Sequence, residues 1–255
     1  MYVGQGIHTP KSATGYSFIE LLAVIIITGI VATVAMRSMT GTNTTAKTEE
    51  TKLKLERIAY GIAGDPNLLS SGVRTSYGYI GDIGGLPPNL DALASNPGGY
   101  TTWKGPYVQD PLTPDGTNTR YKFDGWGKPF SYSGGATIAA TGGGGSITRS
   151  IASSVNDLLR NQVVVTVTDF AGLTPGTAYK DSVRALLDVP NGTGSVVTKL
   201  RFPSRDGYLT FDSIPIGRHL LRVIYLPTND TLRRQVNVDP GTITPVQVQL
   251  FRKVW

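Results

Sequence analysis

The sequence of 255 residues contains no cysteine and only two histidines, His8 and His219. The missing cysteines exclude disulfides, thiolate metal ligands and cysteine nucleophiles. Two histidines offer little material for a zinc site or for histidine-based catalysis. His219 alternates with a leucine in a strand-like segment and has no acidic or serine partner at a recognisable spacing. We therefore expect His219 at the edge or surface of a sheet, and we expect that the protein is not an enzyme.

Glutamate is missing from most of the chain. All four glutamates come before residue 57, and aspartate is the acidic residue used after that point. Glutamate suits helices, whereas aspartate suits turns and caps. Glycine is plentiful, at 31 residues. The sequence therefore predicts an α+β protein, in which one long N-terminal helix is followed by mostly β structure and loops.

Charge of either sign is scarce, because Asp, Glu, Lys and Arg together make up 16% of the residues. The net charge is +6, and no block of like charges appears in the sequence. A small basic surplus without such a block indicates an ordinary solvated surface. We therefore expect no nucleic-acid partner.

The one long apolar run, FIELLAVIIITGIVATVAM, extends from residue 18 to residue 36. A helix of about 20 such residues crosses the hydrocarbon core of a bilayer. The run is longer than the roughly 7–15 apolar residues of a secretory signal peptide, and no clear small-x-small cleavage site follows it. A plain membrane anchor would not explain Glu20, because an unpaired carboxylate inside a membrane is costly. Glu20 therefore needs a partner.

A cut after Gly15 would create that partner, since Tyr16 would then carry a free α-amine. Glu20 lies four residues further on, where the two groups of one helix can meet only awkwardly. Between two subunits shifted along a shared axis, the amine of one subunit can meet the carboxylate of the next. A buried ion pair of this kind would fix the axial register of the subunits.

The segment GYSFIELL, residues 15–22, resembles the prepilin motif of type IV pilins and secretion pseudopilins. The resemblance implies cleavage after Gly15 by a prepilin peptidase, N-methylation of Tyr16, and pairing of subunits through Glu20. It also implies that the partners are an inner-membrane assembly platform, other pilins or pseudopilins, and further copies of the chain in a homo-oligomeric filament. The residues that it implicates in assembly are Phe18, Glu20, Leu21, Leu22 and Gly29.

The segment departs from the motif in three respects. Tyr16 replaces the usual phenylalanine, and the leader carries a single basic residue, Lys11. The proline common near the middle of this helix is missing, and residues 36–38 read Met-Arg-Ser in its place. Gly41 is then the expected weak point of the helix in a filament, because glycine lowers helix stability.

After Gly41, threonine and apolar side chains recur at three- and four-residue steps. The positions are Thr48, Thr51, Leu55, Ile58 and Ile62. This stripe predicts an amphipathic continuation of the same helix, packed on a globular head. An independent surface helix is the alternative. Gly61, Gly64 and the Asp65-Pro66 pair are expected to end the helix.

Two segments of the following region, WKGPY and YKFDGWGKPF, place aromatic residues beside glycine and proline. Such segments form compact loops in which a ring covers the backbone. Over residues 15–150 the chain resembles the major pseudopilin of type II secretion, with an extra residue, Gly125, in the second segment. The matching head-motif residues are Trp103, Gly105, Pro106, Tyr107, Asp124, Trp126, Gly127 and Pro129.

The same resemblance suggests a calcium site, because some members of that family bind calcium near this motif. Calcium takes six to eight oxygen ligands, some of them usually carboxylates. Asp110, Asp115 and Asp124 could supply carboxylates, together with backbone carbonyls. The alternative is that these aspartates cap turns.

The C-terminal part of the chain carries repeated strand signals. Residues 134–148 predict a hairpin or a flexible linker, and residues 150–161 a short helix or connector. Alternating runs follow at 163–169, on both sides of a turn at 214–217, and in RRQVNV and TPVQVQLF, which indicates a β-sandwich. The run RDGYLTFDSIPIGRHLLRV resembles the transthyretin-like sandwiches related to the carboxypeptidase regulatory domain.

We expect four segments along the chain. They are a prepilin leader at 1–15, an N-terminal helix at 16–64 with its membrane part at 16–39, a pseudopilin-like head at 65–160, and a transthyretin-like sandwich at 161–255. The function this implies is that of a structural filament subunit resembling those of a type II secretion pseudopilus. It would lie in the bacterial inner membrane before assembly and afterwards in a periplasmic or cell-surface filament.

Two other functions remain open from the sequence. One is a type IV pilus subunit that displays the sandwich as an adhesive module. The other is a membrane-anchored binding protein, in which the helix only holds the sandwich at the membrane. An N-terminus that is never cut would favour the anchored binding protein.

Overall fold

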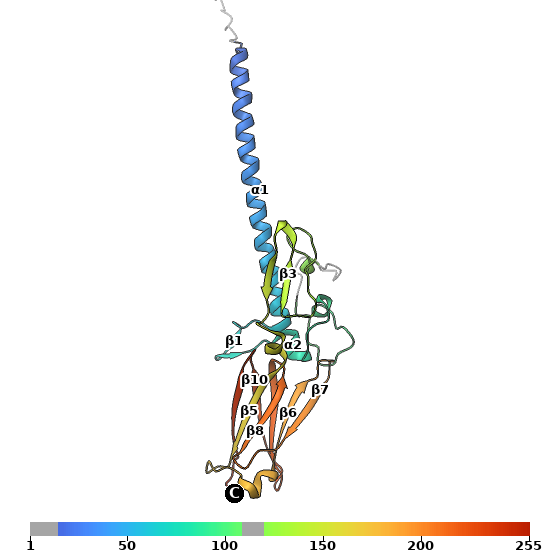
Figure 1. Ribbon diagram of the computed structural model, residues 1–255, viewed down its shortest axis with the longest axis vertical. Coiled ribbons are helices and arrows are strands. Elements are labelled where there is room, and N and C mark those ends of the chain that lie inside the picture. Colours follow the sequence, from blue (N-terminus) through green and yellow to red (C-terminus); the bar gives the residue numbers. More distant parts are fainter. Residues whose placement is uncertain (1–14, 109–119) are drawn as a thin grey trace, which may run out of the picture. The chain divides into compact units, whose positions relative to one another are not determined.

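The computed structural model describes residues 15–108 and 120–255 (Figure 1). The chain divides into two compact units, Met1–Ala46 and Lys47–Trp255. One long helix is followed by short helices and by strands in antiparallel and mixed sheets. This architecture confirms the expected α+β class.

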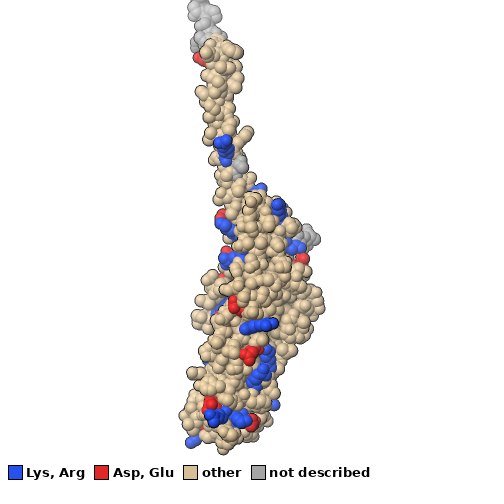
Figure 2. Space-filling view, in the orientation of Figure 1, with Lys and Arg blue, Asp and Glu red and all other residues tan. Residues whose placement is uncertain are grey.

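The N-terminal element is a single helix, α1 (Phe18–Ala63), which continues through Gly41 without a break. Melting at Gly41 inside a filament remains a prediction. In the part of the chain that the structure describes, α1 is the one helix long and apolar enough to span a membrane, and its most apolar window is entirely exposed. Figure 2 shows this N-terminal stretch almost wholly without charged atoms.

Polar side chains within the apolar stretch of α1 are satisfied by the helix itself. The hydroxyl of Thr28 donates to the carbonyl oxygen of Val24 at 2.8 Å, and that of Thr33 donates to Gly29 at 2.8 Å. A bilayer offers no water to hydrogen-bond a polar group, so such internal bonds lower the cost of insertion. The threonines therefore do not argue against a membrane location for this stretch.

The C-terminal part of α1 belongs to the second unit, where its stripe is buried. Thr51, Leu55, Ile58 and Ile62 are each at most 1% exposed. Leu55, Ile58 and Ile62 pack in one hydrophobic cluster with residues of the head. The helix ends where Gly64 adopts a φ of +81° and donates its N–H to Tyr60 at 2.7 Å. The amphipathic continuation is confirmed, and the alternative of an independent surface helix is wrong.

The head is built from short elements around that stripe. They are β1 (Leu69–Ser70), β2 (Val73–Arg74), α2 (Gly78–Ile83), η1 (Leu90–Leu93), η2 (Arg120–Lys122), β3 (Thr137–Ala140), η3 (Gly142–Gly144), β4 (Ile147–Ser150) and α3 (Val155–Leu159). Strands β3 and β4 pair antiparallel, so the expected hairpin is confirmed over the flexible linker. Helix α3 confirms the short helix expected before the sandwich.

The remaining strands form two sheets. They are β5 (Asn161–Thr168), β6 (Val183–Pro190), β7 (Val196–Arg201), β8 (Tyr208–Ile214), β9 (Gly217–Tyr225), β10 (Asp230–Val238) and β11 (Ile243–Gln249). Two small helical turns, α4 (Gly176–Tyr179) and η4 (Lys180–Ser182), precede β6. The sheet orders are β10-β9-β6-β7 and β11-β5-β8. Apolar side chains of both sheets share one core, which gives the expected sandwich-like arrangement.

Strands β6 and β7 are not among the strands expected from the sequence. In β6 the buried residues alternate with partly exposed ones, as in a half-buried strand, but Leu186 on the outer side weakens the pattern. Strand β7 is exposed on both faces, so it carries no alternation to detect. The parallel pairing of β5 with β11 joins strands from opposite ends of the domain, which local sequence does not reveal.

The expected location of His219 is wrong, because this residue is 1% exposed. Strand β9 lies between β10 and β6, so it is central, and His219 has the same parity as the buried Leu221 and Val223. Its Nε2 lies 2.8 Å from the carbonyl oxygen of Pro215 and must donate to it. Burial lowers the pKa of the ring below its usual value of 6.5, although the Pro215 contact opposes this shift.

We predict that acidification below about pH 6.5 destabilises the fold through His219. The folded state keeps the ring neutral, whereas the unfolded chain takes up a proton near pH 6.5, so stability is full above that pH and declines as the pH falls. Urea unfolding between roughly pH 7.5 and pH 5.5 would measure this, because carboxylates stay ionised in that range. His219→Gln should flatten the decline, and an equally steep decline in the variant would contradict the prediction.

The head and the sandwich make direct contact within the second unit. Ile216, from the turn between β8 and β9, is buried in the head cluster, and its N–H donates to Leu158 at 2.8 Å. The N–H of Gly192 donates to the carbonyl oxygen of Ile83 at the end of α2, at 2.7 Å. The proposed division after residue 160 otherwise separates the two hydrophobic clusters.

Candidate assembly site and head motif

The predicted assembly residues lie on the exposed N-terminal part of α1. Gly15 and Tyr16 precede the helix, and Tyr16 is 88% exposed. The apolar members of the set are exposed as well. A helix that is apolar all round needs a bilayer or other helices around it. Its surroundings must therefore come from outside the described chain.

Glu20 has a local role that the sequence-based expectation did not include. Its Oε2 accepts a hydrogen bond from the N–H of Ser17 at 3.0 Å, and Ser17 accepts the first helical bond, from Leu21, at 3.1 Å. Ser17 is thus the N-cap, and Glu20 occupies the third helical position, as in a capping box. The Ser-x-x-Glu spacing was the sequence signal for this contact.

The cap lowers the cost of a carboxylate at this depth. The helix macrodipole favours negative charge in the first turn, and the Ser17 N–H satisfies one oxygen. The other oxygen, Oε1, has no partner in the described part of the chain. Glu20 can therefore cap its own helix and still accept from the amine of a second subunit.

Among the residues that the structure describes, Gly29 has no neighbour that would require a glycine. A Cβ placed there would meet nothing within 4 Å. Small residues on apolar helices allow a neighbouring helix to approach closely. The position is therefore open to a close contact between subunits rather than constrained by the fold of one subunit.

The WKGPY segment folds into the expected loop, in which a ring covers the backbone. The indole Nε1 of Trp103 donates to the carbonyl oxygen of Ala92 at 3.1 Å, and its ring lies against Gly105. The Gly105–Pro106 peptide bond is cis. The rings of Tyr107 and Trp103 meet edge to face, with their centroids 5.6 Å apart, so the motif forms one aromatic cluster in the head.

Asp124 organises the second motif segment. It is 3% exposed, and its Oδ1 accepts from the N–H groups of Trp126 and Lys128, both at 2.9 Å. Its Oδ2 accepts from the N–H of Gly142 at 2.9 Å. The N–H of Gly127 closes the turn by donating to the carbonyl oxygen of Asp124 at 3.0 Å. Asp124 therefore joins the turn at residues 124–128 to η3, which connects β3 and β4.

The rest of the segment leads into the small sheet. Pro129 forms an isolated bridge with Phe123, and Ser131 bridges to Ala139 in β3. The segment therefore begins the short terminal sheet of the head, as the resemblance implied.

The extra residue Gly125 is explained by its contact with α1. Its N–H donates to the hydroxyl of Thr51 at 2.9 Å, and a Cβ at this position would lie 2.5 Å from the carbonyl oxygen of Lys47. The ammonium of Lys54 adds a bond to the carbonyl oxygen of Phe123 at 3.1 Å. These two bonds, from Gly125 to Thr51 and from Lys54 to Phe123, hold α1 against the head, and we call them the head clasp.

The candidate calcium ligands do not form a cluster among the described residues. Asp110 and Asp115 lie outside them, and both oxygens of Asp124 accept from backbone amides. No group of three His, Cys, Asp or Glu side chains with metal-binding geometry occurs in the ranges 15–108 and 120–255. Asp124 acts here as a turn residue, which was the alternative to calcium binding. A calcium site remains a proposal that needs residues 109–119.

The chain has a relative among known proteins. The chain is 31% identical over 123 residues to the type II secretion system core protein G of Xanthomonas campestris pv. campestris. The matched region covers 46% of this chain and 73% of that protein. No family model matches the chain.

Two solved structures have low similarity scores. The Bacillus anthracis TIE protein matches 41% of this chain and 21% of its own, at 13% identity and a TM-score of 0.28. The group B streptococcus pilus 2b backbone protein matches 45% of this chain and 48% of its own, at 12% identity and a TM-score of 0.25. Scores this low carry no conclusion about fold or function.

Proposed function

The chain belongs to the family of type II secretion system core protein G, and we propose that it is a structural subunit of a pseudopilus-type filament. The observation that carries this proposal is the N-terminal helix. Its apolar stretch is exposed on every side, and a single carboxylate, Glu20, lies in its first turn. A helix of this kind is suited first to a bilayer and then to the core of a helical assembly.

Processing comes before assembly in this proposal. A prepilin peptidase cleaves the leader after Gly15, and Tyr16 becomes the N-methylated first residue. The subunit then moves from the bacterial inner membrane, through an assembly platform, into a periplasmic or cell-surface filament. Other pseudopilins and further copies of the chain are its neighbours there. The exposure of Gly15 and Tyr16 supports access by a peptidase.

Register within the filament comes from Glu20. The free oxygen of its carboxylate accepts a hydrogen bond from the α-amine of the neighbouring subunit. The two charges then neutralise each other among apolar side chains. Phe18, Leu21 and Leu22 bury against adjacent helices. Gly29 allows one of these helices to approach closely.

A second function is favoured by the C-terminal sandwich. The related region covers 46% of this chain, so much of the chain has no counterpart in the matched protein. The sandwich contacts the head directly through Ile216, which supports display in a defined orientation rather than on a flexible tether. A type IV pilus subunit that presents the sandwich as an adhesive module would use this geometry. A membrane-anchored binding protein would use it without any filament.

The test is the intact mass of the membrane-extracted protein, with its N-terminal peptide sequenced, from cells that contain a prepilin peptidase. We expect a chain that begins at methylated Tyr16. Gly15→Val should leave the chain starting at Met1, whereas Gly6→Val, the same change within the leader, should be processed normally. A wild-type chain that still starts at Met1 would contradict the filament proposal and favour the anchored binding protein.

A further inference from the structure

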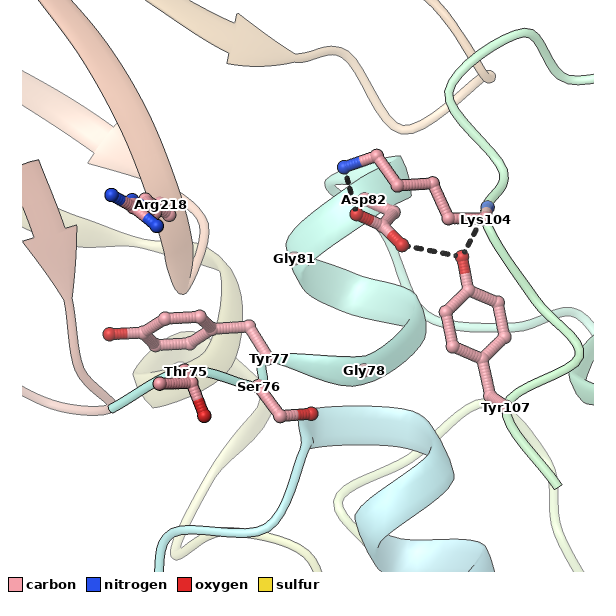
Figure 3. Close-up of a pocket in the computed structure, with 9 residues that line it drawn as sticks. All are labelled: Thr75, Ser76, Tyr77, Gly78, Gly81, Asp82, Lys104, Tyr107 and Arg218. Carbon is pink, nitrogen blue, oxygen red and sulfur yellow. Dashed lines mark hydrogen bonds and ion pairs between the residues drawn. The ribbon is translucent and has the colours of Figure 1, made fainter. Parts of the chain in front are cut away.

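A pocket of about 380 Å³ lies over the first turn of α2 (Figure 3). Residues from the head and from the sandwich line it together. Its main lining side chains are Ser76, Tyr77, Asp82, Lys104, Tyr107 and Arg218. A volume of this size is at the lower end of small-molecule sites. The assembly residues of α1 do not line this pocket, whereas Lys104 and Tyr107 of the WKGPY segment do.

The pocket is formed before any ligand binds, because contacts between the head and the sandwich fix its walls. The end of α2 is bonded to the sandwich through Gly192 and Ile83 at 2.7 Å. The floor is the bare backbone of Gly78 and Gly81. A Cβ at Gly81 would lie 2.4 Å from the Cβ of Tyr77, so a larger residue would displace that ring.

One wall carries a connected network. Asp82 accepts from the ammonium of Lys104 at 2.8 Å and from the hydroxyl of Tyr107 at 2.9 Å. That hydroxyl in turn accepts from the backbone N–H of Lys104 at 3.0 Å. The Asp82–Lys104 pair is neutral as a whole. Because the side chain of Lys104 is 77% exposed, its remaining N–H donors can reach a ligand.

The opposite wall carries an unpaired cation. Figure 3 shows Arg218 and Tyr77 on one side of the α2 turn and the Asp82 network on the other. Arg218 is exposed, and within residues 15–108 and 120–255 its guanidinium makes no hydrogen bond or ion pair. Burial raises the pKa of Tyr77 to about 12, so its hydroxyl is neutral at physiological pH. Among the charged residues that line the pocket, Asp82 and Lys104 pair with each other, so Arg218 is the one lining charge without an ion-pair partner.

We propose that this pocket binds a sugar acid, whose carboxylate pairs with Arg218 and whose hydroxyls bond to the Asp82–Lys104–Tyr107 network. A guanidinium presents two parallel donors that match a carboxylate. One unbalanced cation suits a single negative charge better than a phosphate monoester, which carries about −1.5 to −2. Asp82 adds a carboxylate that would repel a dianion but can accept from hydroxyls. The sugar acid is either free or a uronate unit of a polysaccharide.

Titration of the full-length, detergent-extracted chain with D-galacturonate and D-glucuronate would test the proposal, with galactose and glucose as uncharged counterparts. We expect at least one acid to bind about tenfold more tightly than its neutral sugar. Arg218→Gln should lower the affinity for that acid about tenfold. Arg233→Gln, a change to an exposed arginine of β10 that does not line the pocket, should leave the affinity unchanged.

The proposal would be overturned by no binding of either acid, by equal affinity for acid and neutral sugar, or by unchanged binding in Arg218→Gln. Inorganic phosphate bound as tightly as the acid would also overturn it. A short oligogalacturonate distinguishes the sources, since tighter binding than the monomer supports a polysaccharide and equal binding supports a free acid. All measurements use unassembled subunits, so a negative result leaves the filament proposal unaffected.

Discussion

Subunits carrying Glu20→Gln should enter the membrane and fold but form at least about tenfold fewer filaments than the wild type. The glutamine oxygen can still accept from the N–H of Ser17, so the start of α1 is preserved. The lost negative charge leaves the α-amine of the neighbouring subunit without a counterion among apolar helices. Breaking one half of a buried ion pair costs about 3–5 kcal/mol, which is ample for this loss.

The measurement is the ratio of sheared filaments to membrane-bound subunits, with filaments counted by electron microscopy. Glu49→Gln is the matched control, because it makes the same chemical change on the same helix. Among the described residues, the side chain of Glu49 forms one exposed ion pair, with Lys52 at 2.8 Å, and such a pair is worth about 0.2–0.5 kcal/mol. Wild-type amounts of filament from Glu20→Gln would show that Glu20 acts only as a helix cap. Loss of the subunit from the membrane would instead implicate insertion.

Asp124→Ala should destabilise the second unit by about 3–5 kcal/mol, because three backbone amides lose a buried, charged acceptor at once. For a unit of this size, that corresponds to a fall in melting temperature of roughly 6–20 °C. The damage should reach α1, since the turn that Asp124 organises also presents the N–H of Gly125 to Thr51. Thermal unfolding followed by circular dichroism would measure the change.

Asp206→Ala is the matched control, because the side chain of Asp206 is 64% exposed and, among the described residues, its one ion pair is with its neighbour Arg205. It should change stability by less than about 0.5 kcal/mol. A loss of stability no larger than this for Asp124→Ala would show that the turn organised by Asp124 does not stabilise the fold. The same experiment in calcium and in EDTA tests the metal hypothesis. A wild-type melting temperature that rises with calcium would support a site that involves residues 109–119.

Several features could be read from the sequence because they depend on local pattern. The apolar run up to Met36 dictates an exposed helix, and the stripe around Leu55 dictates where that helix packs. The alternation of apolar and polar residues predicted β5, and the alternating runs on both sides of the turn before Gly217 predicted β8 and β9. Strand β7 gave no such signal, since its residues are exposed on both faces. The cap formed by Glu20 was readable from the Ser-x-x-Glu spacing but was not expected.

The sequence by itself determined the long helix, its charged first turn, the head motif and most of the strands. Each of these follows from periodicity or from the conformational preferences of neighbouring residues. Only the tertiary structure decided that His219 is buried, that Gly125 reaches Thr51, and that Arg218 and Asp82 line the same pocket. These outcomes depend on strand order and on contacts between residues far apart in the chain. No local preference encodes such contacts, because their free energy comes from packing the whole unit together.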